Sequence, residues 1–240
     1  MSREVVVVSG CRTAIGTYGG SLKDTPPTVL GALVVREALK RANVEGADVG
    51  HVVFGHVINT EPKDMYLSRV AAVNGGCSHE TPAFNVNRLC GSGLQAIISA
   101  AQAIALGDCD VAIGGGAESM SRAPYANLTA RWGARMGDAK LIDMMVGALH
   151  DPFDTIHMGV TAENVAAKWG ITREDQDSLA LESHKRAERA TQEGRFKEQI
   201  VPVMLKSKKG EVAYDTDEHF RVNAQATDFS KLRPVFIKEN

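Results

Sequence analysis

One cysteine in the chain stands where a nucleophile would be useful. Cys90 lies in the order NRLCGSG, after a short apolar run and before three small residues. Apolar residues then recur at helical spacing, namely Leu94, Ile97, Ile98, Ala101 and Ile104. The pattern predicts a strand, a tight turn that holds Cys90, and a helix whose free N–H groups favour an anion. Because the thiolate is the nucleophilic form of cysteine, this turn could support nucleophilic chemistry.

A purely structural role is the alternative for Cys90. A cysteine beside a buried helix is most often a small apolar filler. On this feature alone the filler is the better interpretation. Gly91 and Gly93 weigh on the other side, because glycines let a substrate approach the backbone closely.

The elements that must position Cys90 are predicted to alternate between strands and helices. Residues 4–9 form a β-branched run typical of a strand buried on both faces. Further strands are expected over 51–58, around Phe84 and over 110–113. Helices are expected after Pro27, over 65–74 and after Cys90. The helix over 65–74 should turn Leu67, Val70 and Ala71 inward. This alternation predicts an α/β fold with a mostly parallel sheet. Ligands of such sheets bind beyond the carboxyl ends of the strands, where Cys90 lies.

Three glycines at 114–116 match neither a dinucleotide-binding fingerprint nor a phosphate-binding loop. After a buried strand, they are expected to allow close backbone packing.

From about residue 118 the regular alternation stops. Arginines are interleaved there with proline and glycine, and long irregular segments are often functional or interfacial. A helix is expected over 162–169. Thr172 and Asp175 have the spacing of a capping box for the next helix, which should end near Gly194 with Leu179, Ala180, Ser183, Ala187 and Ala190 inward. Strands over 200–205 and 211–214 should be joined through the basic turn 206–210.

Several motifs together resemble those of the thiolase family. NRLCGSG is followed by GDCDVAIGGGAESMS, and the resemblance runs from VVVVSGCRTAIGTYGG to KLRPVF. It implies a thiolase-like layered fold with a mostly parallel sheet, divided into an N-terminal α/β domain at 1–117 and an inserted irregular loop domain at 118–240. It also implies CoA-dependent acyl transfer, in which short acyl-CoA or 3-ketoacyl-CoA is condensed or cleaved through an acyl-cysteine.

The same resemblance assigns site residues. Cys90 is implied as the acyl-accepting nucleophile, with its backbone N–H as an oxyanion donor. His157 and Met158, in HMGVTAEN, are implied near the pantetheine and acyl end of the pocket, together with Leu149. Arg221, in DEHFR, matches a CoA-contacting arginine. Taken alone, the histidine would be a structural residue and the arginine half of a surface ion pair.

Three motifs of the family do not occur in this sequence. They are GHPxGxxG, CxGGG and NEAF, which supply the base, the second cysteine and the asparagine. The chain therefore resembles the first half of a thiolase, without the C-terminal domain and without the last helix and strand of the first domain. A sheet edge left unpaired in this way favours association. A non-catalytic fragment that binds CoA or complements a partner chain is the alternative, and a ketoacyl synthase relative is a weaker one.

Composition limits the class of protein. The chain has 240 residues, of which 44% are hydrophobic and 23% charged, and its net charge is −2. These values predict a globular protein and argue against a general nucleic-acid binder. No apolar run approaches the roughly 20 residues of a membrane helix, so no membrane span is expected. Four cysteines lack metal or disulfide spacing, so a reduced, cytoplasmic protein is expected. The resemblance implies CoA as a substrate, no metal or other cofactor, and a homo-oligomer, in the family a tetramer that uses residues 131–140.

Overall fold

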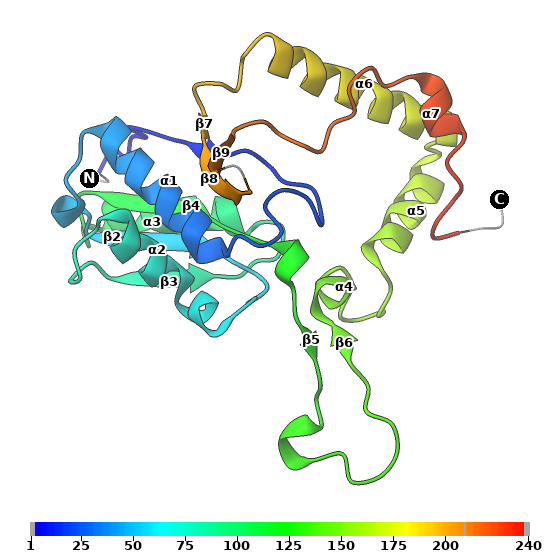
Figure 1. The fold of residues 1–240 in the computed structure, drawn as a ribbon, viewed down its shortest axis with the longest axis horizontal. Coiled ribbons are helices and arrows are strands. Elements are labelled where there is room, and N and C mark those ends of the chain that lie inside the picture. Colours follow the sequence, from blue (N-terminus) through cyan, green and yellow to red (C-terminus); the bar gives the residue numbers. More distant parts are fainter. Residues whose placement is uncertain (1–2, 209, 238–240) are drawn as a thin grey trace. The chain divides into compact units, whose positions relative to one another are not determined.

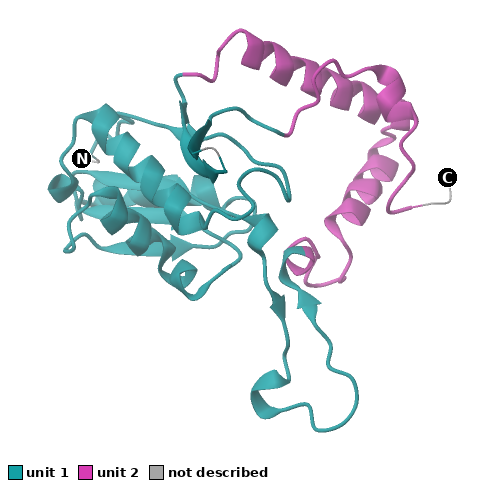
Figure 2. Cartoon of the chain, viewed as in Figure 1, with its two compact units in different colours: residues 1–145, 198–218 teal, residues 146–197, 219–240 magenta. Residues whose placement is uncertain are grey.

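The computed structural model describes residues 3–208 and 210–237 of the chain. These residues fall into two compact units, coloured separately in Figure 2. Unit 1 contains residues 1–145 and 198–218, and unit 2 contains residues 146–197 and 219–240. Each unit consists of two stretches of chain, and no boundary between the units falls between residues 117 and 118. The predicted division at that point concerns an insertion into the family fold and stays a prediction.

A three-stranded parallel sheet forms the centre of unit 1 (Figure 1). Its strands are β2 (His51–Gly55), β3 (Ala83–Val86) and β4 (Ala112–Gly116), in the order β3-β2-β4. Helix α2 (Leu67–Gly75) connects β2 to β3, and α3 (Ser92–Leu106) connects β3 to β4. The predicted alternation and parallel pairing are therefore confirmed.

The side chains of β2 alternate between two helical layers, as period-2 strand geometry requires. Val52 and Phe54 pack into a buried cluster with Leu67 of α2. Helix α1 (Pro27–Ala42) contributes Val35 to the same cluster. Val53 points to the other face, where it packs against Ala96 and Ala100 of α3.

Glycines in β4 allow close packing on both faces of the sheet, with α3 approaching Gly114 and Phe54 approaching Gly115. A Cβ on Gly114 would lie 2.7 Å from the Ile97 Cα, and one on Gly115 would lie 3.0 Å from the Phe54 ring. Both distances are shorter than van der Waals contact, so neither position has room for a larger side chain. The glycines lie inside the strand rather than after it.

The prediction of a buried strand over residues 4–9 is wrong. This segment forms no strand, and Val6, Val7 and Val8 are 66%, 85% and 68% exposed. A β-branched run becomes a strand only when a neighbouring strand supplies its hydrogen bonds. The first paired residues are those of β1 (Arg12–Thr13), which lies beside β7 (Ile200–Val201).

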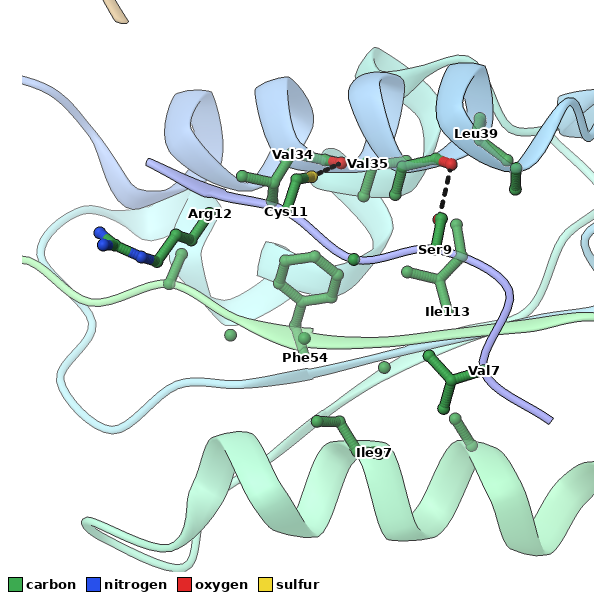
Figure 3. Close-up of a pocket in the computed structure, with 18 of the residues that line it drawn as sticks. Val7, Ser9, Cys11, Arg12, Val34, Val35, Leu39, Phe54, Ile97 and Ile113 are labelled. Carbon is green, nitrogen blue, oxygen red and sulfur yellow. Dashed lines mark hydrogen bonds between the residues drawn. The ribbon is translucent and has the colours of Figure 1, made fainter. Parts of the chain in front are cut away.

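A groove separates residues 5–8 from β4. It has a volume of about 700 Å³, and its walls come from the N-terminal segment, β4, α1 and α3. Figure 3 shows the segment that carries Val7, Ser9 and Cys11 passing between α1 and Ile97. Ser9 Oγ and Cys11 Sγ donate to carbonyls of α1 at 2.9 Å and 3.3 Å. Within the described residues, the outer edge of β4 has no strand partner.

The large apolar residues of α3 are exposed in the described chain. Leu94, Ile97 and Ile98 are 66%, 49% and 39% exposed, whereas the buried positions are the small residues Ser92, Ala96 and Ala100. By length and composition alone, Leu89–Leu106 is apolar enough to cross a membrane, contrary to the sequence expectation. Core helices of soluble proteins pass the same test, and α3 packs on β2 and β4.

The remaining elements are shorter or more irregular. Unit 1 includes the strand pairs β5 (Tyr125–Ala126) with β6 (Ile142–Asp143), and β8 (Val203–Ser207) with β9 (Gly210–Tyr214). It also contains four 3-10 helices, Gly46–Asp48, Pro62–Tyr66, Met120–Arg122 and Ala130–Trp132, among its described residues. The β8–β9 pair confirms the predicted hairpin, although Lys209 of its basic turn and the last residues 238–240 lie outside the described residues.

Unit 2 is mainly helical. Its helices are α5 (Met158–Trp169), α6 (Arg173–Gln192) and α7 (Ala226–Ser230), and α4 (Met144–Ala148) crosses its boundary. The capping box at the start of α6 is confirmed, since Thr172 Oγ1 accepts from the Asp175 N–H and the Asp175 carboxylate accepts from the Thr172 N–H. The predicted inward stripe of α6 is wrong at Leu179, which is 72% exposed, and at Ser183, which is also exposed.

Candidate active site

Cys90 lies in a tight turn between β3 and α3. It is exposed, and it stands immediately before Gly91, the residue that caps α3. Leu89 has a φ of 46°, a left-handed conformation that residues other than glycine seldom adopt. Such conformations cluster at functional sites, where surrounding contacts keep them in place. The predicted strand, turn and helix are confirmed, with Cys90 in the turn two residues before α3 begins at Ser92.

Two side chains hold the Cys90 turn. Asn87 Oδ1 accepts from the Leu89 N–H at 3.0 Å. Ser92 Oγ accepts from the Arg88 N–H at 2.8 Å and donates to the Leu89 carbonyl at 2.7 Å. Sequence reasoning did not single out Asn87 or Ser92, although both lie next to Cys90 in the motif.

The other three cysteines have different surroundings. Burial raises the pKa of Cys11, Cys77 and Cys109, and the carboxylates of Asp108 and Asp110 raise that of Cys109 further. A raised pKa leaves less thiolate at neutral pH, so these thiols are poorer nucleophiles. Of the four cysteines, only Cys90 is exposed.

A second group of predicted residues lies at the start of α5. His157 precedes the helix, and its Nδ1 accepts from the Gly159 N–H at 2.9 Å. The neutral ring therefore carries its proton on Nε2, which leaves an N–H donor for a ligand. The Met158 N–H donates to the Leu149 carbonyl at 2.8 Å. The structure thus brings Leu149, His157 and Met158 together.

Phe236 completes this group, and sequence reasoning missed its role. Its ring stacks on His157 with centroids 4.8 Å apart, while His150 meets His157 edge-on at 5.3 Å. A Cβ on Gly159 would lie 2.1 Å from the Phe236 ring, so a larger residue at this point of α5 would displace the ring. The only signal in the sequence was the KLRPVF match, and no spacing rule relates that stretch to residue 157.

Arg221 stands on a segment that is fixed to α6. Its backbone N–H donates to His184 Nδ1 at 3.0 Å, and the Asn223 N–H donates to the Glu188 carboxylate at 3.0 Å. Arg221 itself is exposed. A cationic side chain on a fixed backbone suits recognition of phosphate, to which guanidinium groups donate strong, charge-assisted hydrogen bonds.

The acidic residues of the same DEHFR stretch anchor a loop of unit 1. Asp217 binds the Arg12 guanidinium through both oxygens at 2.8 Å and 3.0 Å and accepts from the Ile15 N–H. Burial opposes ionisation of Asp217, but the bonds from Arg12 and Ile15 outweigh it and lower its pKa. Hydrogen bonds from Ser21, and then from Thr17, lower the pKa of Glu218.

The predicted site residues are divided between the two units. Cys90 belongs to unit 1, whereas Leu149, His157, Met158 and Arg221 belong to unit 2. Each group is built by contacts within its own unit. No cluster of three or more histidine, cysteine or acidic residues that could hold a metal ion occurs within residues 3–208 and 210–237.

Comparison with known families decides the class of protein. The pattern described as "Thiolase, N-terminal domain" matches residues 5–240. The chain belongs to the thiolase family. Among similar proteins, beta-ketothiolase BktB of Cupriavidus necator is 72% identical over the whole chain, and an acetyl-CoA acetyltransferase of Syntrophomonas wolfei is 46% identical over 99% of it.

Solved thiolases have the same fold. The crystal structure of the Bacillus anthracis acetyl-CoA acetyltransferase is 40% identical over 99% of this chain, with a TM-score of 0.95. Human mitochondrial 3-ketoacyl-CoA thiolase is 39% identical over 97% of it, with a TM-score of 0.93. This thiolase chain spans 61% of the Cupriavidus relative and 60% of the Bacillus structure, in each case the N-terminal part.

Proposed function

We propose that this chain is the nucleophile-bearing part of a thiolase-type acyltransferase. Cys90 is the acyl acceptor: its thiolate attacks the carbonyl carbon of an acyl-CoA thioester, a bond from the Cys90 sulfur to that carbon forms, and the bond to the CoA sulfur breaks. CoA leaves as a thiolate with the electron pair. The observation that carries the proposal is the exposed Cys90 in a strained turn directly before α3.

Cysteine suits this chemistry for two reasons. It is a good sulfur nucleophile, and it is also a good leaving group when the acyl group is passed on. The Cys90 backbone N–H is proposed as the donor that stabilises the oxyanion of the tetrahedral intermediate.

The proposed substrates are short-chain acyl-CoA and 3-ketoacyl-CoA thioesters. The relatives are named acetyl-CoA acetyltransferase and beta-ketothiolase, which supports this class and a place in fatty acid metabolism. Leu149, His157 and Met158 are proposed to contact the pantetheine arm, and Arg221 a phosphate of CoA. CoA is the co-substrate, and no metal or further cofactor is proposed.

Limited alkylation of the 240-residue chain with iodoacetamide at neutral pH tests the nucleophile. Peptide mass analysis should find Cys90 labelled first, because the pKa of each other thiol is raised by burial. In parallel, excess acetyl-CoA should slowly add one acetyl group to the chain and none to Cys90→Ala. Faster labelling of Cys11, Cys77 or Cys109 would contradict the assignment.

The groove beside β4 favours a second candidate role, that of a fragment which complements a partner chain. Within residues 3–208 and 210–237, this largely apolar groove is bordered by a strand edge without a partner, and such an edge is a template for association. We propose a homo-oligomer or a complex with a complementing C-terminal half. The exposed Trp132 and Met136, within residues 131–140, support a contact there. A cytoplasmic location is part of the same proposal.

A further inference from the structure

Polar groups that the proposed chemistry does not use join the ends of β2 and β4. The Ala117 N–H donates to the Gly55 carbonyl at 3.2 Å, which extends the strand pairing by one step. Directly beyond it, His56 Nδ1 donates to the Ala117 carbonyl at 2.8 Å. The Glu118 carboxylate accepts from the backbone N–H groups of Val57 and Ile58 at 2.8 Å and 3.2 Å. We call His56 and Glu118 the cross-tie.

The first turn of α3 rests directly on the strand ends that the cross-tie joins. A Cβ on Gly55 would lie 2.5 Å from the Ser92 carbonyl carbon and 2.7 Å from the Gly93 nitrogen. A Cβ on Gly116 would lie 3.6 Å from the Gly93 Cα. No side chain separates these backbones, so a shift of either strand end moves the start of α3.

A second connection runs from the cross-tie to the turn itself. Val57, whose N–H is held by Glu118, offers its carbonyl to Asn87 Nδ2 at 3.5 Å, a long and weak contact. Asn87 then holds the Leu89 N–H at 3.0 Å. Leu89 is the residue with a φ of 46°. The cross-tie therefore reaches the strained position next to Cys90 through backbone contacts and one side chain.

The side chains around the cross-tie are more polar than is needed merely to hold the ends of β2 and β4 together. His56 and Asp64 have side chains only 1% and 0% exposed, with His56 Nε2 3.9 Å from an Asp64 oxygen. Among the described residues, His56 Nε2 and the other Asp64 oxygen are buried without a hydrogen-bond partner. Unsatisfied buried polar atoms destabilise a fold, and apolar side chains would join the strands without this cost.

We propose that Glu118 and His56 are positioning residues for the nucleophile. They fix the ends of β2 and β4, on which α3 and the Cys90 turn rest, and so hold Cys90 before the positive end of the helix. The inference rests on the proposed role of Cys90. Neither residue touches the reacting atoms; both act through the backbone.

The test compares Glu118→Gln and His56→Leu with a matched control at the other end of β2. His51→Leu also removes an imidazole, but at the first residue of β2 rather than just after its last, where the ring lies 5.4 Å from Phe84. His56→Asn is the conservative variant, because its side-chain amide can donate where Nδ1 does. Each full chain is measured by thermal melting, by the alkylation rate of Cys90 and by amide hydrogen exchange of the peptide over residues 87–92.

We expect Cys90 alkylation to slow about fivefold in Glu118→Gln and His56→Leu, the size of a lost interaction with the helix dipole. Amides of residues 87–92 should exchange faster, while α1 and α2 keep their protection. His51→Leu should change neither quantity, and His56→Asn should restore both. The sign is informative for Glu118, because a mere loss of negative charge near a thiolate would speed alkylation.

Two results would overturn the inference. The first is that Glu118→Gln and His56→Leu both leave Cys90 alkylation unchanged or faster and leave amide exchange at residues 87–92 unchanged. The second is that His51→Leu, at the same loss of melting temperature, changes alkylation and exchange as much as these two variants do. If Cys90 is not the first thiol labelled in the unaltered chain, the proposed function fails instead. The exchange measurement then still decides whether the cross-tie holds the turn.

Discussion

The ring of Phe236 lies flat against the ring of His157, with centroids 4.8 Å and planes 26° apart. Its position depends on Gly159, where a Cβ would lie 2.1 Å from the Phe236 ring. The stack orients the imidazole whose Nδ1 caps α5 and whose Nε2 is left to donate.

Gly159→Ala should therefore displace Phe236 and weaken CoA binding. Gly147→Ala is the matched control, because it also lies in a helix of this region and has no atom within 4 Å of the added Cβ. The control should be neutral or more stable by about 0.4–1 kcal/mol, as for other compatible glycine-to-alanine changes. Calorimetry with CoA and thermal melts measure both variants. Equal CoA affinity in the two variants would show that the Phe236–His157 stack is not part of the binding site.

Arg221→Ala should weaken CoA binding and make the remaining affinity less dependent on salt, because a guanidinium–phosphate pair is screened by ions. Arg186→Ala is the control; it removes a cation from α6 that pairs with Glu182 on the surface. Isothermal titration at two ionic strengths gives both quantities. An equal loss in the two variants would mean a general charge effect rather than a contact at Arg221.

Acid should loosen the loop that Asp217 and Glu218 hold. The folded-state pKa of each carboxyl is lowered, so the stability that they contribute is present above their ordinary pKa of about 4 and is lost as the pH falls through the folded value. The double variant Asp217→Asn with Glu218→Gln should be less stable at neutral pH and should lose less stability on acidification. Melting curves across the acid range compare it with the parent. Parallel pH profiles would show that other groups cause the acid loss.

Alkali should weaken the hydrogen bond by which Tyr214 holds the same loop at Ile15. Burial, and then the charges of Glu218 and Asp217, raise the pKa of Tyr214 to about 12. Its hydroxyl donates to the Ile15 carbonyl at 2.8 Å, and this contribution is lost as the pH rises through that value. Tyr214→Phe should remove this alkaline loss of stability. Ultraviolet titration of tyrosine together with thermal melting measures it. Persistence of the same alkaline transition in Tyr214→Phe would place its origin elsewhere.

Association should depend on the groove beside β4. Val7 lines the groove and is 85% exposed, so Val7→Lys should reduce self-association and dye binding with little change in melting temperature. Val53 is fully buried, and Val53→Ala should cost about 1–3 kcal/mol. Light scattering across a concentration series, with a fluorescence melt, separates the two effects. A parent chain that stays monomeric at every concentration, without dye binding, would show that this surface does not mediate association.

The 240-residue chain alone should not cleave acetoacetyl-CoA above background. Its sequence lacks the GHPxGxxG and CxGGG motifs, to which the family resemblance assigns the base and the second cysteine. Removing members of a catalytic set commonly costs several orders of magnitude. A thiolysis assay with Cys90→Ala as the blank measures this. Turnover that disappears in the blank would mean that groups within these residues supply the missing proton transfers.

The sequence by itself determined the local elements. The capping box of Thr172 and Asp175 and the turn–helix unit at Cys90 follow from residue types a few positions apart, and the β8–β9 hairpin joins two strands that are neighbours in the chain. The motifs also predicted the family that the comparison found.

Tertiary structure decided what depends on distant partners. Residues 4–9 have the composition of a buried strand, yet they form no strand, because a strand needs hydrogen bonds from a neighbour, and residues 4–8 are exposed. Helix α3 buries Ala96 and leaves Leu94 exposed, and its backbone approaches Gly114 of β4 closely. The stacking of Phe236 on His157 and the tie from Glu118 to Val57 join residues far apart in the chain. No local pattern encodes such contacts, since they form only when folded elements present their surfaces to each other.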